Sequence, residues 1–119
     1  MPHLIQRASI LGTGLIGGSF AKALRKYTPD IRVAGWDRRE VAVDAGKSGA
    51  IHEVFSGSLD AALRGSDLIY IALPIGATLD LLPEIARHAP AHALAQTVSH
   101  AGRLCLHTPV LGSELARLL

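Results

Sequence analysis

Gly12-Thr13-Gly14-Leu15-Ile16-Gly17 is the stretch of sequence that decides the fold of this chain. It follows an apolar run over 8–12 that is typical of a buried strand, and it opens a segment over 15–26 with apolar residues at helical spacing. In a G-x-G-x-x-G turn the first glycine allows the tight turn, the second admits a pyrophosphate, and the third lets the helix pack on the strand. The sequence therefore predicts a dinucleotide-binding turn. The alternative is that the glycines serve close helix–strand packing alone.

Outward from this turn, apolar runs alternate with helical patterns. Further strands are predicted at 31–36, 51–55, 67–73 and 93–98, and further helices at 38–47, 58–64 and 75–88. This alternation predicts an α/β fold with a doubly wound parallel sheet and right-handed crossovers. We assign a Rossmann-type dinucleotide-binding domain to 1–98. The periodicity weakens after it, so 99–119 is interpreted as an atypical tail that packs on this domain or on a partner chain, with two turns of helix at 112–119.

Asp37 ends the second predicted strand, 20 residues after Gly17. A carboxylate there is placed to accept hydrogen bonds from the adenosine ribose hydroxyls of a dinucleotide. Its charge repels a 2′-phosphate, which favours NAD. Arg38 follows directly and is able to pair with such a phosphate or to stack on adenine, so NADP stays open. Helix capping by Asp37, with Glu40 at the third helical position, is the alternative role.

Leu73 and Pro74 stand at the end of the predicted strand 67–73. Ligands of doubly wound sheets bind outside the carboxyl ends of the strands, so we expect these two residues, and Ile75 after them, to line the cofactor cleft. Simple termination of the strand is the alternative.

Composition limits the remaining possibilities. The 119 residues are 49% hydrophobic and 18% charged, as in a single folded domain. A single cysteine, Cys105, excludes an internal disulfide and fits the cytoplasm. The net charge of +2 comes without a basic cluster, and the longest uncharged stretch, 68–79, is interrupted by Pro74 and Gly76. We therefore expect no nucleic-acid partner and no membrane span. The spacing of the histidines favours no metal site.

Four segments carry a resemblance to a known family: 12–21, 35–38, 66–74 and 76–82. Together they resemble the prephenate/arogenate dehydrogenase family of tyrosine biosynthesis, over a match from about residue 7 to about residue 95. The resemblance implies an NAD(P)-binding Rossmann domain. It also implies oxidative decarboxylation of prephenate or arogenate, by hydride transfer from the ring carbon that bears the hydroxyl.

The end of the chain departs from the family pattern. Thr97 stands where the family has an acid after the fifth strand, and the family's lysine is missing. Ser99 is a candidate to hydrogen-bond the substrate or nicotinamide. His107, in a loose version of the family's histidine segment, is the candidate general base. A turn serine and an ordinary tail histidine are the alternatives.

The family's helical second domain is expected to be absent from this chain, so we interpret the chain as a shortened member or a fragment. We expect it to form a homo-oligomer and to have weak or no dehydrogenase activity alone. A dinucleotide-binding module without turnover, or a related hydroxyacid or imine dehydrogenase, are the alternatives.

Overall fold

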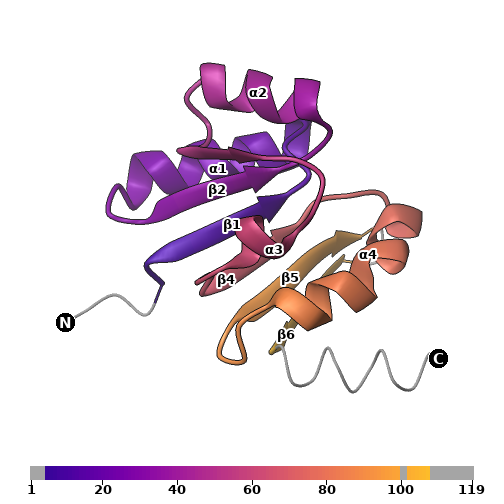
Figure 1. Cartoon of the computed structure of the whole chain (residues 1–119). Helices are drawn as coiled ribbons and strands as arrows, with labels where there is room; N and C mark the ends of the chain where they lie inside the picture. The colour runs from indigo at the N-terminus through magenta and orange to yellow at the C-terminus, as the bar shows by residue number, and fades with distance from the viewer. Residues whose placement is uncertain (1–4, 100–101, 108–119) are drawn as a thin grey trace.

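A computed structural model describes residues 5–99 and 102–107, and the side chains of 5–97 (Figure 1). Six strands belong to this part of the chain: β1 (Arg7–Leu11), β2 (Arg32–Trp36), β3 (Glu53–Phe55), β4 (Leu68–Ile71), β5 (Leu94–Ser99) and β6 (Gly102–His107). The helices are α1 (Leu15–Tyr27), α2 (Arg39–Lys47), α3 (Asp60–Leu63) and α4 (Ile75–His88). Helices and strands alternate from β1 to β5, as the sequence predicts.

The strands form one sheet in the order β3-β2-β1-β4-β5-β6. The first five are parallel, and β6 runs antiparallel to β5. The chain builds outward from β1 to β2 and β3, then returns to add β4 on the other side of β1. The predicted doubly wound Rossmann-type fold is confirmed. Its topological switch point lies between β1 and β4, where such sheets bind ligands.

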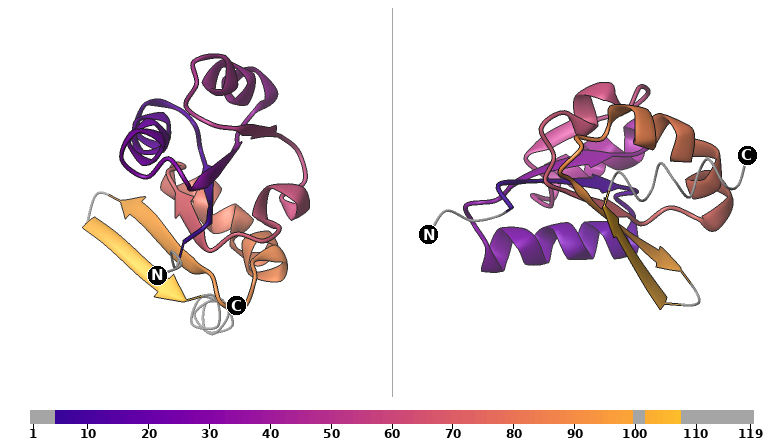
Figure 2. Two further views of the ribbon diagram at one scale, coloured as in Figure 1. Left: turned by 90° about the vertical axis from the view of Figure 1, so that its left-hand side faces the viewer. Right: turned by 90° about the horizontal axis from the view of Figure 1, so that it is seen from below.

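β6 is an element that the sequence analysis did not predict. Its pairing with β5 runs from Ser99 opposite Gly102 to Leu94 opposite His107, so the two strands form a hairpin (Figure 2). The range 99–119 thus contributes the last residue of β5 and all of β6 to the same sheet. The signal was present, because Leu104 and Leu106 alternate with Arg103, Cys105 and His107 at the period of a strand. The helix predicted at 112–119 lies outside the described residues.

Two apolar layers hold the helices on the sheet. On one face, Ala21 of α1 and Ala45 of α2 pack with Ile10, Val33 and Tyr70 of the strands. The Phe20 ring of α1 stacks on Tyr70 with the ring centroids 3.9 Å apart. The opposite face is covered by α3 and α4, through the fully buried side chains Leu59, Leu63, Ile69, Ile71 and Ile85.

Two glycines of the β1–α1 turn are required by close backbone approach. Gly12 has φ +95°, a left-handed conformation, and a β-carbon there would lie 2.6 Å from the Ala72 carbonyl oxygen. A β-carbon on Gly17 would overlap the Gly12 carbonyl oxygen. The first turn of α1 therefore rests directly on the end of β1, which is the packing role predicted for the third glycine of the motif.

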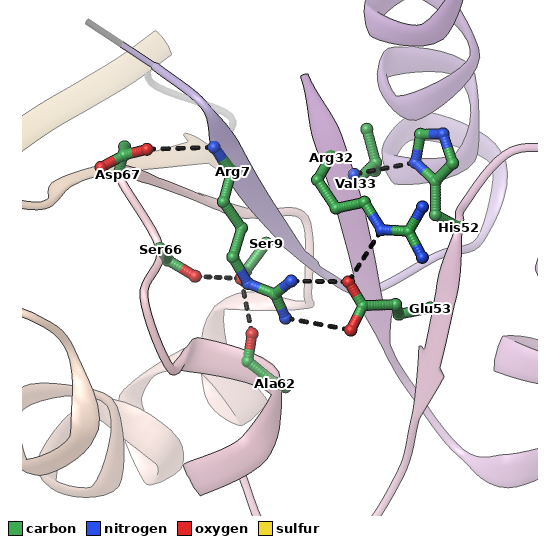
Figure 3. Close-up of polar contacts among 9 residues, drawn as sticks. All are labelled: Arg7, Ser9, Arg32, Val33, His52, Glu53, Ala62, Ser66 and Asp67. Carbon is green, nitrogen blue, oxygen red and sulfur yellow. Dashed lines mark hydrogen bonds and ion pairs between the residues drawn. The ribbon is translucent and has the colours of Figure 1, made fainter. Parts of the chain in front are cut away.

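Charged side chains join the opposite, amino-terminal ends of the strands (Figure 3). Glu53 of β3 pairs with Arg7 of β1 at 2.6 Å and with Arg32 of β2 at 3.2 Å. The Arg7 hydrogen bond, helped by Arg32, lowers the pKa of Glu53 despite its partial burial. These contacts link three neighbouring strands at one end.

Asp67 holds the start of β1 in the same region. Its Oδ2 accepts hydrogen bonds from the backbone N–H groups of Gln6 at 2.8 Å and Arg7 at 3.0 Å, and its Oδ1 lies 2.7 Å from His92 Nε2. Burial opposes the charged form of Asp67. The hydrogen bonds from Gln6, His92 and Arg7 outweigh it and hold the pKa below its ordinary value.

Asp67→Asn is expected to reduce stability at neutral pH by about 1–3 kcal/mol, because the charged acceptor of these hydrogen bonds is lost. Because the pKa of Asp67 is lower in the folded state than in the unfolded state, the carboxylate adds to the free energy of unfolding at pH values above its ordinary pKa. This contribution is lost as the pH falls through the pKa of the folded state. The difference between wild type and variant should therefore shrink toward acid pH. Urea unfolding at several pH values measures it. Asp80→Asn, an exposed carboxylate on α4, is the control, and an equal loss for both variants would contradict the assignment.

Gly17→Ala is expected to destabilise the fold by more than about 3 kcal/mol, because the added methyl group meets backbone that cannot move aside. Gly14→Ala is the matched comparison, since a β-carbon on Gly14 meets no atom within 4 Å. Thermal unfolding of the two variants should separate them clearly. Similar unfolding temperatures would show that the turn is more adaptable than its geometry indicates.

Candidate functional site

Three loops meet at the carboxyl ends of β1, β2 and β4. The register places Leu11 opposite Trp36 of β2 and opposite Ile71 of β4, so the three strands end at the same level. These loops and the first turn of α1 carry the ten predicted cofactor-binding residues: Gly12, Thr13, Gly14, Leu15, Ile16, Gly17, Asp37, Arg38, Leu73 and Pro74. The structure brings these residues to one edge of the sheet, beside the switch point.

The amino terminus of α1 is open toward this edge. Gly14 is its N-cap, no side chain caps it, and its first turn contains no acidic residue. The backbone N–H groups of this turn have no acceptor within the helix, because the first intrahelical bond is donated by Gly18 to the Gly14 carbonyl oxygen at 2.8 Å. Free N–H groups and the positive end of the helix dipole suit a phosphate group.

Asp37 is held beside this turn by backbone donors. Its Oδ2 accepts a hydrogen bond from the Thr13 N–H at 2.8 Å, and its Oδ1 accepts one from the Arg38 N–H at 2.7 Å. The N-cap of α2 is Arg38, and no side chain caps the helix. The alternative capping role for Asp37 is therefore wrong: its carboxylate joins the glycine turn to the end of β2.

Leu73 and Pro74 adjoin the glycine turn. A β-carbon on Gly12 would lie 3.0 Å from Leu73 Cδ2, and Pro74 is the exposed N-cap of α4. Both residues thus stand where the sequence analysis expected the cofactor cleft.

Four apolar side chains on the first turns of α1 and α4 are exposed: Leu15 by 88%, Ile16 by 55%, Ile75 by 65% and Leu79 by 52%. The helical pattern predicts all four on core-facing stripes, and for these residues that prediction is wrong. The buried residues of these first turns are instead Gly17 and Gly18 of α1 and Thr78 of α4, so the apolar side chains beside them are left exposed. Ile75 is thus exposed at the edge where the sequence predicts the cofactor cleft, and Leu79 is a residue of this edge that the sequence analysis did not name.

The two predicted catalytic residues lie at opposite ends of β5 and β6. Ser99 ends β5, two positions after Thr97, which pairs with Ile71 at the level of the glycine turn. His107 pairs with Leu94 at the start of β5. Leu94 lies three positions before Thr97, which corresponds to about 10 Å along the strand. The backbone register thus brings Ser99 to the edge of the predicted cofactor site and takes His107 away from it.

Among the side chains that the structure describes, those of 5–97, no three His, Cys, Asp or Glu residues are grouped so that they could hold a metal ion. Within residues 5–99 and 102–107, no helix combines the length and the apolar character needed to cross a bilayer.

Comparison with known proteins identifies relatives over this part of the sheet. The chain is 39% identical over 85 residues to a prephenate dehydrogenase of Lactococcus lactis subsp. cremoris, covering 69% of this chain and 23% of that protein. It spans about a quarter of the length of the curated relatives it matches. No protein-family model matches the chain.

Solved structures show the same fold. A prephenate dehydrogenase from A. aeolicus in complex with hydroxyphenyl propionate and NAD⁺ superposes with a TM-score of 0.70 at 22% identity, over 79% of this chain and 33% of that one. The arogenate dehydrogenase of Synechocystis gives 0.69 at 23% identity, over 78% and 32% of the two chains. The resemblance stated from the sequence motifs is thus confirmed: this chain is a relative of the prephenate/arogenate dehydrogenases over a segment that amounts to about a quarter of their length.

Proposed function

We propose that this chain binds NAD at the carboxyl edge of its sheet and forms the dinucleotide-binding part of a prephenate or arogenate dehydrogenase. The observation that carries the proposal is the open first turn of α1 beside a fixed carboxylate. The turn offers N–H groups to the pyrophosphate, and Asp37 offers acceptor atoms to the adenosine ribose. The relatives' names and the NAD⁺ in the A. aeolicus structure support the same assignment.

The arrangement also favours NAD over NADP. Backbone donors hold the Asp37 carboxylate beside the turn, where the ribose hydroxyls would lie. A 2′-phosphate would bring like charge against it. Arg38 is exposed and stands next to this position, which is the feature that favours the NADP alternative.

The apolar side chains at the edge suit the uncharged parts of the cofactor. Leu15 and Ile16 follow the glycine turn on one side, and Ile75 and Leu79 follow Pro74 on the other. Ring systems that pack on these side chains would remove exposed apolar surface from water. Bound NAD supplies the hydride acceptor, while this chain contributes binding, orientation and a charge at the ribose.

For turnover, the substrate has to be held beside the nicotinamide, within about 3–3.5 Å of the reacting carbon. Ser99 is our candidate for a substrate or nicotinamide contact, on the strength of its position at the edge. Reduction of NAD with prephenate and then with arogenate, followed by absorbance, decides between the two substrates.

A dinucleotide-binding module without turnover is the second candidate, favoured by Thr97 and the missing lysine. We further propose a cytoplasmic homo-oligomer.

Gly14→Val is expected to weaken NAD binding at least about tenfold, or about 1.4 kcal/mol, because the side chain enters the space where the pyrophosphate would approach. Isothermal titration calorimetry measures the affinity. Ala23→Val, at an exposed position on the same helix, is the control for the added bulk. Equal affinity of a folded Gly14→Val protein would refute binding at this turn.

Asp37→Asn is expected to lower NAD affinity and to raise NADP affinity relative to it, because the negative charge near the ribose is removed. The substitution keeps the size of the side chain and one acceptor oxygen for the Thr13 N–H. Glu40→Gln, an exposed acid in the first turn of α2, is the matched control. If the ratio of the two affinities is the same in both variants, Asp37 does not set the cofactor preference.

A further inference from the structure

Trp36 is the last residue of β2 and lies where three neighbouring strands end together. The register places it opposite Leu11 of β1 and Phe55 of β3. Its carbonyl oxygen accepts a hydrogen bond from the Gly12 N–H at 2.8 Å, so it holds the first glycine of the turn. The residue that follows it is Asp37, which carries the carboxylate at the proposed ribose position. Movement at Trp36 would therefore be passed to both parts of the proposed site.

The indole group of Trp36 makes a further contact, with the loop between β3 and α3. The ring is partly buried and packs against the apolar layer formed with α3 and α4. Its Nε1–H donates a hydrogen bond to the Gly57 carbonyl oxygen at 3.0 Å. Gly57 has φ +79°, a left-handed conformation that glycine adopts without strain. Because the core holds the ring, the indole N–H is a well-placed donor for this loop.

The loop also contacts Asp37 directly, through a weaker bond. The Asp37 N–H donates to the Phe55 carbonyl oxygen at 3.3 Å, which is longer than a typical N–H···O hydrogen bond. Positions 56–58 of the loop are exposed, and the buried Leu59 anchors its far end. In the described part of the chain, the bond from Trp36 to Gly57 is the hydrogen bond that ties the middle of this loop to a strand.

We propose that Trp36 is a positioning residue for the Asp37 carboxylate. Its indole N–H holds the β3–α3 loop against the end of β2, and the loop in turn holds the Asp37 peptide through Phe55. This support keeps the carboxylate in reach of the Thr13 N–H, which donates to it at 2.8 Å. The inference rests on the proposed NAD site and goes beyond it, because it assigns part of the cofactor preference to a hydrogen bond within the protein.

The first test removes the indole donor without changing the shape of the ring. The chain contains one tryptophan, so a tryptophan-auxotrophic host can introduce β-(3-benzothienyl)alanine at position 36 alone. This analogue has a sulfur atom in place of the N–H group. We expect calorimetry to show NAD binding at least about threefold weaker, and a smaller ratio of NAD to NADP affinity, because one neutral hydrogen bond is lost.

Thr28→Val is the matched control for this substitution. It removes another hydrogen bond from a side chain to the backbone, which the Thr28 hydroxyl donates to the Leu24 carbonyl oxygen at 2.6 Å. Thr28 lies at the carboxyl end of α1, away from the proposed site. Both cofactor affinities of this variant should equal those of the wild type. Equal losses in the control and the analogue would overturn the proposal.

A double-mutant cycle separates positioning of the carboxylate from a general structural role. If Trp36 acts through Asp37, the analogue should leave the ratio of NAD to NADP affinity unchanged in an Asp37→Asn background, because residues that act through one group are not additive. A general structural role would change the affinities by the same factors in both backgrounds. That result, or a ratio that the analogue leaves unchanged when Asp37 is present, would overturn the proposal.

Hydrogen exchange tests the positioning role without any cofactor. The Asp37 amide should exchange at least about threefold faster in the analogue than in the wild type, because the loop that carries its acceptor is less firmly held. Thr28→Val should leave this rate unchanged. An Asp37 amide that exchanges at the wild-type rate in the analogue would overturn the proposal. If the wild-type chain has no affinity for NAD, the proposed function fails, and this exchange rate alone decides whether Trp36 positions Asp37.

Discussion

The contact on which this fold depends is between two glycines. Gly17 in the first turn of α1 lies against the carbonyl group of Gly12, so the helix begins directly on the end of β1. This close approach fixes where the amino terminus of α1 points. Gly12 in turn lies close to the carbonyl group of Ala72, just beyond the end of β4. Backbone packing, rather than interdigitating side chains, therefore fixes how the loops after β1 and β4 lie relative to one another. The shape of the switch point follows from this arrangement.

The two ends of the sheet have different physical characters. At the amino-terminal end, Glu53 pairs with Arg7 and Arg32, and Asp67 accepts hydrogen bonds from backbone N–H groups. At the carboxyl end, helix N–H groups and exposed apolar side chains are left without partners in the described part of the chain. The polar contacts that join the strands are thus concentrated at the amino-terminal end, and the groups free to contact a ligand are at the carboxyl end.

Much of this was accessible from the sequence, for identifiable reasons. The glycine motif, Asp37 and the apolar run that contains β4 each have a strict local pattern, and the structure brings them together as expected. The exposure of Leu79 was not accessible, because periodicity shows which residues of a helix are apolar but not which of them the sheet covers. β6 was overlooked because a six-residue alternation is a weak signal beside a strong β–α pattern. The pairing of that strand also moved His107 away from the site, since the direction of an edge strand cannot be inferred from its residues.

The hydrogen bonds of Asp37 have a consequence for how tightly a cofactor is held. A free aspartate on a surface samples several rotamers, and a ligand that fixes it loses part of its binding free energy to that ordering. In this chain the Thr13 and Arg38 N–H groups fix the carboxylate while one acceptor direction on each oxygen remains unused. The conformational entropy of the Asp37 side chain is therefore lost during folding and not when a ligand binds. The carboxylate is pre-organised, so the ribose affinity expected of the proposed site depends on the integrity of a turn that the ribose hydroxyls need not contact.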